Sequence, residues 1–248
     1  MVTYTTGARS SKMKGINFDK QYNLIDMESL SGWQVKVFGL GSIGSILVKQ
    51  LALVGVQNII GYDYDTVDED NIGSQEYRLE HIGMKKTDAI QKMMKGDYNF
   101  DMGIVEGEIT EETEILPEDK TLYFCAFDSL EARKILWDKL KTFPVIWGES
   151  RIGLTSQRLY FVDLRNHDEK WIQEYEETLN PEGPRTELKC GEKGTYPSNT
   201  ELVGKVVRQI VNIFEGNDFA TQFVGDWGMP PAVFNMPIQV VPTKMDYN

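Results

Sequence analysis

The chain has 248 residues, of which 41% are hydrophobic, so it can bury a sizeable core in one large domain or two small ones. Its formal net charge of -12 disfavours nucleic acid and anionic membranes as partners. With only two cysteines, Cys125 and Cys190, and no C-x-x-C pair, neither a disulfide framework nor a zinc site is expected.

The N-terminal stretch and the apolar runs bear on the compartment. Residues 1–15 are polar, weakly basic and predicted to be mobile, and they lack the apolar core of a signal peptide. No run of about 18 apolar residues occurs, so no transmembrane helix is expected. We therefore expect a cytoplasmic protein that has neither nucleic acid nor a membrane as its partner.

Short β-prone runs alternate with helix-patterned segments through the first part of the chain. Strands are expected at 34–38, 58–62, 102–109, 121–126 and 145–149. Helices are expected at 18–30, 43–54, 85–94 and 130–140, the third of them ending near Gly96. The repeated β-α-β order predicts a parallel sheet with helices on both faces.

The pattern changes after the fifth predicted strand. Residues 156–164 alternate as in a strand, and residues 200–214 have the spacing of an amphipathic helix. Between them, 165–199 shows no clear period and is predicted to be an irregular crossover region. The predicted fold is α/β, with a Rossmann-like, mostly parallel sheet, helices on both faces and antiparallel strands at the C-terminal end. Because no internal repeat or linker occurs, residues 1–248 are interpreted as a single domain.

The glycine turn, defined as residues 39–44 (GLGSIG), joins the first strand to the helix 43–54 with the spacing G-x-G-x-x-G. Glycine lets the backbone approach a phosphate, and the first N–H groups of the helix have no partner within it. The next strand ends at Asp63, whose carboxylate can accept hydrogen bonds from ribose hydroxyls. This βαβ unit predicts nucleotide binding, and the alternative is a turn that only permits close helix–strand packing.

Further motifs follow the glycine turn in order. They are Asp63-x-Asp65-x-Val67, then Asn71 to Gln75, then Gly83-x-x-Lys86, then Cys125-x-x-Asp128 with Arg133. Together they resemble the ThiF/MoeB/HesA family of ATP-dependent activating enzymes, relatives of ubiquitin-activating enzyme, over about residues 18–150. The resemblance implies a homodimer that uses ATP and magnesium to adenylate the C-terminal carboxylate of a small ubiquitin-like protein or peptide, for sulfur transfer or conjugation.

The resemblance also implies site residues. The implied cofactor-binding residues are Gly39, Gly41, Ser42, Gly44, Asp63, Asp65 and Lys86. The implied catalytic residues are Lys20, Asn71, Gln75, Lys86, Asp128 and Cys190. Lys86 would neutralise phosphate charge, Asp128 would hold the magnesium, and Arg133 would brace the loop through a salt bridge.

Plainer structural roles stand beside these assignments. Turn or helix capping is the alternative for Asp63, Asp65, Asn71 and Asp128. A lysine at the start of a helix, such as Lys86, is usually solvated. Cys125 is expected to be core packing. Cys190 would supply a nucleophilic thiol if Lys189 and Lys193 lower its pKa, and it is otherwise an incidental thiol.

Several departures from the family pattern keep other functions open. Ser74 occupies the place of a catalytic arginine, for which Arg78 is a candidate substitute. Lys20 occupies the place of an arginine that reaches the ATP of a dimer partner. A lysine supplies the positive charge but not the planar guanidinium group, which can donate two parallel hydrogen bonds to a phosphate. A second hypothesis is therefore a non-catalytic subunit that binds a partner or an active homologue. A third is an NAD-dependent oxidoreductase, which shares the first βαβ unit.

Overall fold

A computed structural model of the chain describes residues 15–226 apart from 22, 154–155, 167 and 181–193. This described part contains a seven-stranded sheet with the order β3-β2-β1-β4-β5-β6-β7. The strands are β1 (Gln34–Phe38), β2 (Asn58–Asp63), β3 (Gly103–Glu106), β4 (Thr121–Cys125), β5 (Ile146–Ile152), β6 (Ser156–Asp163) and β7 (Gln222–Asp226). The helices are α1 (Met27–Ser31), α2 (Gly44–Val54), α3 (Lys86–Tyr98), α4 (Leu130–Leu140), α5 (Glu169–Thr178) and α6 (Tyr196–Glu215), with the 3-10 turns η1 (Glu69–Asn71) and η2 (Leu79–His81).

The sheet has a parallel part and an antiparallel part. The strands β3, β2, β1, β4 and β5 are parallel, whereas β6 and β7 run antiparallel to their neighbours. The α/β fold class predicted from the sequence is therefore confirmed. Because parallel strands all end at the same edge, the residues after β1, β2 and β4 meet there.

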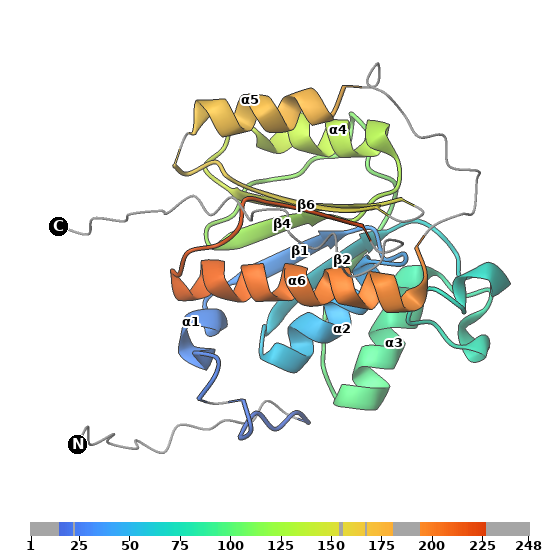
Figure 1. Cartoon of the computed structure of the whole chain (residues 1–248). Coiled ribbons are helices and arrows are strands. Elements are labelled where there is room, and N and C mark those ends of the chain that lie inside the picture. The colour runs from blue at the N-terminus through green and yellow to red at the C-terminus, as the bar shows by residue number, and fades with distance from the viewer. Residues whose placement is uncertain (1–14, 22, 154–155, 167, 181–193, 227–248) are drawn as a thin grey trace, which may run out of the picture.

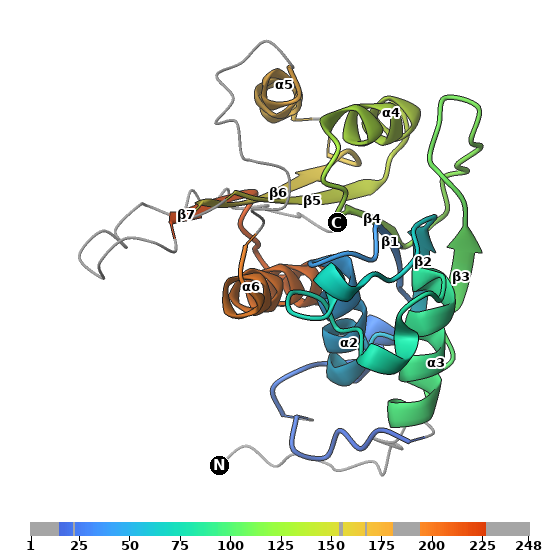
Figure 2. The same cartoon turned by 90° about the vertical axis from the view of Figure 1, so that its right-hand side faces the viewer.

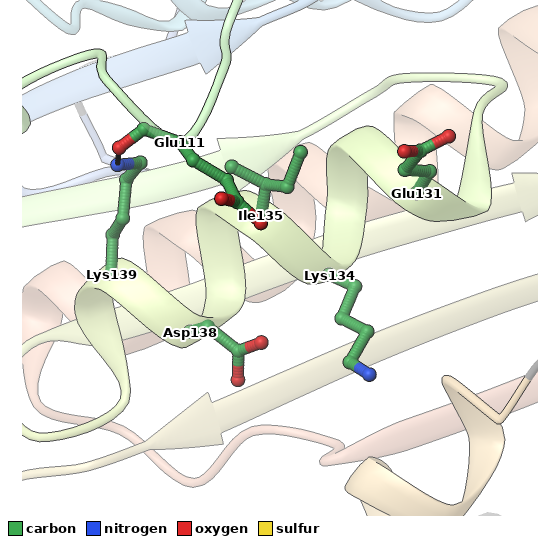
Figure 3. Close-up of a pocket in the computed structure, with 6 residues that line it drawn as sticks. All are labelled: Glu111, Glu131, Lys134, Ile135, Asp138 and Lys139. Atoms are coloured by element: carbon green, nitrogen blue, oxygen red, sulfur yellow. Dashed lines mark hydrogen bonds between the residues drawn. The ribbon is translucent and has the colours of Figure 1, made fainter.

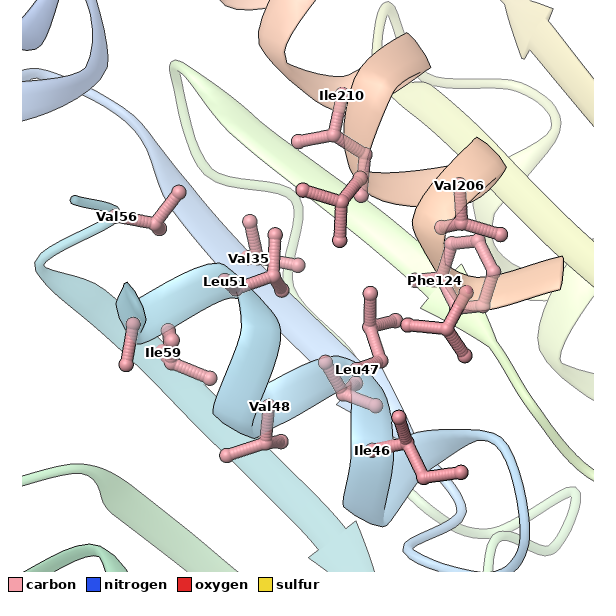
Figure 4. Close-up of a cluster of buried hydrophobic side chains, with 14 of the residues drawn as sticks. Val35, Ile46, Leu47, Val48, Leu51, Val56, Ile59, Phe124, Val206 and Ile210 are labelled. Atoms are coloured by element: carbon pink, nitrogen blue, oxygen red, sulfur yellow. The ribbon is translucent and has the colours of Figure 1, made fainter. Parts of the chain in front are cut away.

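Helices α2, α3 and α6 lie on one face of the sheet, and α1 packs against α6 (Figures 1 and 2). The side chains buried on this face are mostly aliphatic, with several phenylalanines among them. Val35 and Val37 of β1 and Phe124 of β4 are fully buried on this face. They pack against Leu47 of α2 and Val206 of α6 in one cluster (Figure 4). Burial of each such side chain contributes about 1.5–3 kcal/mol, so this cluster fixes α2 and α6 against the sheet.

The opposite face, under α4 and α5, is aromatic (Figure 1). Trp137 of α4 lies edge-on to Trp147 of β5 and to Tyr175 of α5, with ring centroids 5.5 Å and 4.6 Å away. The indole Nε1 of Trp147 donates a hydrogen bond of 2.8 Å to the hydroxyl of Tyr175. The rings thus bury a large apolar area while the polar atom of Trp147 keeps a partner.

The helix predicted at 18–30 is largely wrong, because helix α1 begins only at Met27. Its start is fixed by Asp26, whose side chain accepts a hydrogen bond of 3.0 Å from the N–H of Glu28. Upstream, the side chain of Asn17 accepts from the N–H of Asp19 at 2.8 Å. Asn and Asp side chains compete with helix formation by bonding nearby backbone, which the apolar spacing alone does not reveal.

Helix α3 runs through Gly96 instead of ending there. It ends at Asn99, whose φ of 49° is left-handed and whose N–H donates to the carbonyl of Lys95 at 3.0 Å. Asparagine is one of the few residues other than glycine that adopts this conformation at moderate cost.

The prediction of an irregular region over 165–199 missed α5 and the first turn of α6. The side chain of Asp168 caps α5 by accepting from the N–H of Trp171 at 3.1 Å, and Trp171 and Tyr175 share its inner face. Glycine and proline residues mark the sequence only after residue 180, and they obscured the short helical pattern before it. Strand β7 was also not predicted.

The sequence is also β-prone at 232–241, and this tail lies outside the described residues, as does the N-terminal stretch that is expected to be mobile. Within the described ranges, no helix combines the length and apolar character needed to cross a membrane.

Replacing Gly96 by alanine should stabilise the protein by about 1 kcal/mol, because glycine inside a helix is less favourable than alanine. A Cβ at this position would meet nothing within 4 Å. Urea unfolding measures the change, with Asn99→Ala as the opposing variant, which should destabilise by about 1 kcal/mol. A loss of stability in Gly96→Ala would mean that α3 ends at Gly96 after all.

Candidate functional site

The glycine turn lies at the carboxyl edge of the sheet between β1 and α2. Gly39 has a φ of +94°, which glycine adopts without strain. A Cβ on Gly44 would lie 1.8 Å from the carbonyl oxygen of Gly39, so any side chain there would prevent this closure. A Cβ on Gly41 would meet nothing within 4 Å, so the turn is open on that side, with Ser42 next to it. The turn therefore fits an approaching phosphate group.

Asp63 ties the glycine turn to the end of β2. Its Oδ2 accepts a hydrogen bond of 2.6 Å from the N–H of Leu40, and its Oδ1 accepts one of 2.8 Å from the N–H of Asp65. This is the capping role that the sequence left as an alternative. A carboxylate has further lone pairs, so the ribose role stays a prediction.

Tyr77 holds the glycine turn from the opposite direction and was missed in the sequence. Its buried hydroxyl donates a hydrogen bond of 2.8 Å to the carbonyl of Leu40, and it lies 3.5 Å from the carbonyl oxygen of Lys86. Burial, followed by the charges of Asp63 and Asp65, raises the pKa of Tyr77 well above its ordinary value, so it remains a donor. In the sequence, Tyr77 is marked only as an aromatic residue in the otherwise polar segment between the second strand and the next helix.

Lys86 is buried at the start of α3, in contrast to an ordinary solvated lysine. Its Nζ lies 2.8 Å from Oδ2 of Asp65, a half-exposed carboxylate that compensates the buried charge. The adjacent Lys85 points elsewhere, donating to the carbonyl of Tyr64 at 2.8 Å. Of these two adjacent lysines, Lys86, which the G-x-x-K spacing from Gly83 selects, is therefore the one held beside Asp65.

Asn71 and Gln75 differ in what they leave for a ligand. Oδ1 of Asn71 accepts from the N–H of Asp68 at 3.0 Å, so Asn71 caps the turn η1. Oε1 of Gln75 is buried and, in the described part of the chain, has no hydrogen-bond partner. Because a buried polar atom without a partner costs about 1–3 kcal/mol, the amide of Gln75 can bind an additional donor.

Arg133 braces the loop that follows β4, as the motif predicts. Its Nε donates to the carbonyl of Phe127 at 3.0 Å, and its second terminal nitrogen donates to the same oxygen. Its Nη1 lies 2.7 Å from Oε1 of Glu149, which is fully buried. The backbone just before Asp128 is therefore fixed by a buried ion pair.

Glu149 is the centre of a buried network on the aromatic face. Its carboxylate also bonds Arg151 and the hydroxyl of Tyr175. Burial alone would raise the pKa of Glu149, but the charges of Arg133 and Arg151 and these hydrogen bonds lower it below its ordinary value. The carboxylate thus stays ionised inside the protein at neutral pH.

Asp128 follows β4 and is exposed at the carboxyl edge. In the described part of the chain, no three His, Cys, Asp or Glu residues form a cluster that could hold a metal by themselves. Magnesium is commonly held by one or two carboxylates together with phosphate oxygens. A single exposed carboxylate at the same edge of the sheet as the glycine turn fits that mode, so magnesium binding by Asp128 stays a prediction.

Within the described part of this one chain, Lys20 and Arg78 lie away from this arrangement. Lys20 is exposed, and its neighbour Gln21 bonds the carbonyl of Leu53 at 3.1 Å, at the end of α2 about 16 Å from the glycine turn. Arg78 pairs with Asp97 near the far end of α3, so the structure does not place it as a substitute at Ser74. Cys190 lies outside the described residues.

Cys125 is confirmed as core packing. It is fully buried in β4, and burial raises the pKa of its thiol to about 12. A thiol in this state supplies no nucleophile at neutral pH.

A shallow hollow lies along α4, away from the glycine turn (Figure 3). Its lining is Glu111, Glu131, Lys134, Ile135, Asp138 and Lys139. The side chain of Lys139 reaches the carbonyl of Glu111 at 2.5 Å. Its lining carries charges of both signs and includes no predicted site residue. The carboxyl edge of the sheet therefore remains the candidate nucleotide site.

Comparison with known proteins gives a family and several relatives. The model of the ThiF family matches residues 15–221. Ubiquitin-like modifier-activating enzyme 5 of Dictyostelium discoideum is 25% identical over 140 residues, 51% of this chain and 37% of that protein. SUMO-activating enzyme subunit 2 of the same organism is 41% identical over 73 residues, 29% of this chain and 11% of that protein. The chain thus spans well under half the length of these curated relatives.

Solved structures share the fold. The structure of PaaA has a TM-score of 0.59 and 21% identity, covering 80% of this chain and 70% of PaaA. E. coli MccB with ATP has a TM-score of 0.58 and 13% identity, covering 83% of this chain and 67% of MccB. At these identities the likeness concerns the fold, which is that of the ThiF/MoeB-like activating enzymes.

Replacing Arg133 by methionine should destabilise the protein by about 3 kcal/mol, because it removes one of the cations that compensate buried Glu149. The matched control is Lys205→Met, which breaks a surface pair with Glu201 and should cost less than about 1 kcal/mol. Urea unfolding at several pH values measures both.

The loss of stability in Arg133→Met should depend on pH, and the direction of this dependence follows from the pKa of Glu149. The folded pKa of Glu149 is lowered, so its contribution is complete above the ordinary value of about 4.3 and is lost as pH falls through the folded pKa. The difference in the free energy of unfolding between the native protein and Arg133→Met should therefore become smaller as the pH falls through the folded pKa of Glu149. Equal losses in Arg133→Met and Lys205→Met at neutral pH would contradict the buried-pair account.

Proposed function

Because the chain belongs to the ThiF family, we propose that it is an ATP-dependent adenylyltransferase. One observation carries the proposal: the open glycine turn and the buried Lys86 are joined through a single residue. The hydroxyl of Tyr77 donates to the carbonyl of Leu40 at 2.8 Å and lies 3.5 Å from that of Lys86. The glycine turn and the start of α3 are therefore fixed to each other, and the Nζ of Lys86 is held by Asp65 at 2.8 Å, which supports the proposal of triphosphate binding here.

The reaction joins a carboxylate to the α-phosphate of ATP. An oxygen of the substrate carboxylate bonds the α-phosphorus, the bond to the bridging oxygen of the β-phosphate breaks, and pyrophosphate leaves with that electron pair. Two anions meet in this step, so positive charge must stabilise the transition state. Magnesium, held by Asp128 when bound, would supply part of that charge.

The residues of the chain have separate roles in this proposal. The backbone of the glycine turn would hold phosphate oxygens, and Asp63 would accept from the ribose hydroxyls. Lys86 would face the phosphates, with Asp65 keeping its ammonium group in place. The free amide oxygen of Gln75 would accept a hydrogen bond from the incoming substrate.

We propose the C-terminus of a small ubiquitin-like protein or a peptide as the substrate. Support comes from the curated relatives, which are named as ubiquitin-like modifier-activating and SUMO-activating enzymes, and from MccB, which is solved together with MccA. The product would serve sulfur transfer or conjugation, with Cys190 as the thiol that accepts the acyl group. Assembly as a homodimer, with Lys20 facing the partner, a single domain and a cytoplasmic location belong to the same proposal.

A non-catalytic subunit is the second candidate, and a specific observation favours it. Ser74 occupies the place of the family arginine, and Arg78, the nearest candidate substitute, pairs with Asp97 instead. Such a subunit would bind nucleotide without forming an adenylate.

Replacing Asp128 by asparagine should weaken binding of Mg-ATP about tenfold, or 1.4 kcal/mol, because the charge on the metal-binding carboxylate is lost. Calorimetric titration measures it, with NAD as comparator ligand. Asp138→Asn on α4 is the matched control and should bind Mg-ATP as the native chain does. Unchanged affinity in Asp128→Asn would exclude Asp128 as the magnesium ligand, and preference for NAD would exclude the adenylyltransferase proposal.

Replacing Lys86 by methionine should weaken Mg-ATP binding by a factor of about ten or more, because a charge-assisted contact with phosphate is removed. Lys85→Met is a control of the same composition at the adjacent position, where the lysine contacts Tyr64 and Glu106. The same titration compares them. If Lys85→Met loses as much affinity for Mg-ATP as Lys86→Met, the loss comes from removing a positive charge anywhere near the site, and Lys86 has no specific role.

A further inference from the structure

The first turn of α6 contacts the 74–77 segment, from which it is distant in sequence. The hydroxyl of Tyr196 donates to Oε1 of Glu76 at 2.5 Å, across 120 residues. Nδ2 of Asn199 donates to the carbonyl of Ser74 at 3.2 Å, across 125 residues. Asn199 is fully buried, so its bond forms where water does not compete.

The 74–77 segment in turn holds the glycine turn. The N–H of Glu76 donates to Oγ of Ser45 at 3.2 Å, and that hydroxyl donates to the carbonyl of Gly41 at 2.7 Å. The hydroxyl of Tyr77 donates to the carbonyl of Leu40 at 2.8 Å. The segment therefore holds the carbonyl of Leu40 directly through Tyr77, and reaches the adjacent carbonyl of Gly41 through Ser45.

Charge strengthens the contact between α6 and this segment. The nearly buried carboxylate of Glu76 also pairs with Nζ of Lys49 on α2 at 2.8 Å. Burial and the hydrogen bond to Glu76 raise the pKa of Tyr196, so its hydroxyl stays a donor to the carboxylate of Glu76. Charge-assisted hydrogen bonds of this kind are roughly twice as strong as neutral ones.

We infer that Glu76, Tyr196 and Asn199 are positioning residues that couple the first turn of α6 to the shape of the glycine turn. The carbonyls of Leu40 and Gly41 keep their orientation only while that first turn is docked on the 74–77 segment. Further along α6, Val206 and Ile210 belong to the buried hydrophobic cluster that also contains α2, and this apolar packing supplies no polar partner to Ser74 or Glu76 (Figure 4). The consequence for ATP affinity rests on the proposed function, whereas the coupling itself does not.

Hydrogen–deuterium exchange of the full chain without ligand tests the coupling directly. In Glu76→Gln and Tyr196→Phe, amides of residues 39–45 should exchange about tenfold faster, while the core of α6 at 206–214 exchanges as in the native chain. Glu201→Gln is the matched control, since it breaks an ion pair with Lys205 on the same helix and should change neither region. Thermal unfolding of each variant shows whether the change is local.

A titration with Mg-ATP is the second arm and should show about tenfold weaker binding in both variants. If the amides of residues 39–45 exchange at the native rate in Tyr196→Phe and Glu76→Gln, the coupling is overturned. It is also overturned if amide exchange becomes faster across the whole sheet, because that result indicates global destabilisation. If the native chain fails to bind Mg-ATP, the proposed function falls, and the exchange data still decide the coupling.

Discussion

The closure of the glycine turn is the constraint on which the carboxyl edge depends. Gly44 can begin α2 only because it has no side chain, since a Cβ would lie 1.8 Å from the carbonyl oxygen of Gly39. That contact brings the N-terminus of α2 to the end of β1, with the buried Leu40 and the partly exposed Gly41 between them. Their backbone groups are then fixed by side chains from other parts of the chain, Asp63 and Tyr77 among them. The buried aliphatic cluster below keeps α2 from moving away.

What could be predicted from the sequence was local. The strands and helices of the βαβ units have strong periodicity, because each must bury one face against the sheet, and α4 was predicted with its exact limits of 130–140. The G-x-G-x-x-G spacing located the turn, because backbone conformation limits those positions to glycine. The family resemblance assigned Arg133 its bracing role, and the structure shows its side chain bonded to the loop a few residues away.

What could not be predicted depends on contacts between distant segments or on competing local bonds. Tyr77, Glu76 and Asn199 belong to no motif, and their roles follow from a helix and a loop that meet only in the folded chain. The predicted helix at 18–30 failed because Asp26 bonds the backbone of Glu28 and starts the helix late. Both errors have the same origin: apolar spacing reports burial and is silent about polar partners.

The charges at the carboxyl edge would affect the two parts of the proposed function, nucleotide binding and catalysis, to different degrees. Lys86 is already compensated by Asp65 at 2.8 Å, and Asp63 and Asp128 add negative charge to the same edge. Backbone N–H groups of the glycine turn need no net charge to hold phosphate oxygens, so affinity depends little on the residue at position 74. The transition state develops charge that the ground state lacks, and one lost stabilising donor lowers a rate by a factor on the order of 10²–10³. If the proposed function holds, Ser74 would therefore bear on the rate of adenylation far more than on the binding of ATP, and nucleotide affinity alone would not distinguish the enzyme from a binding subunit.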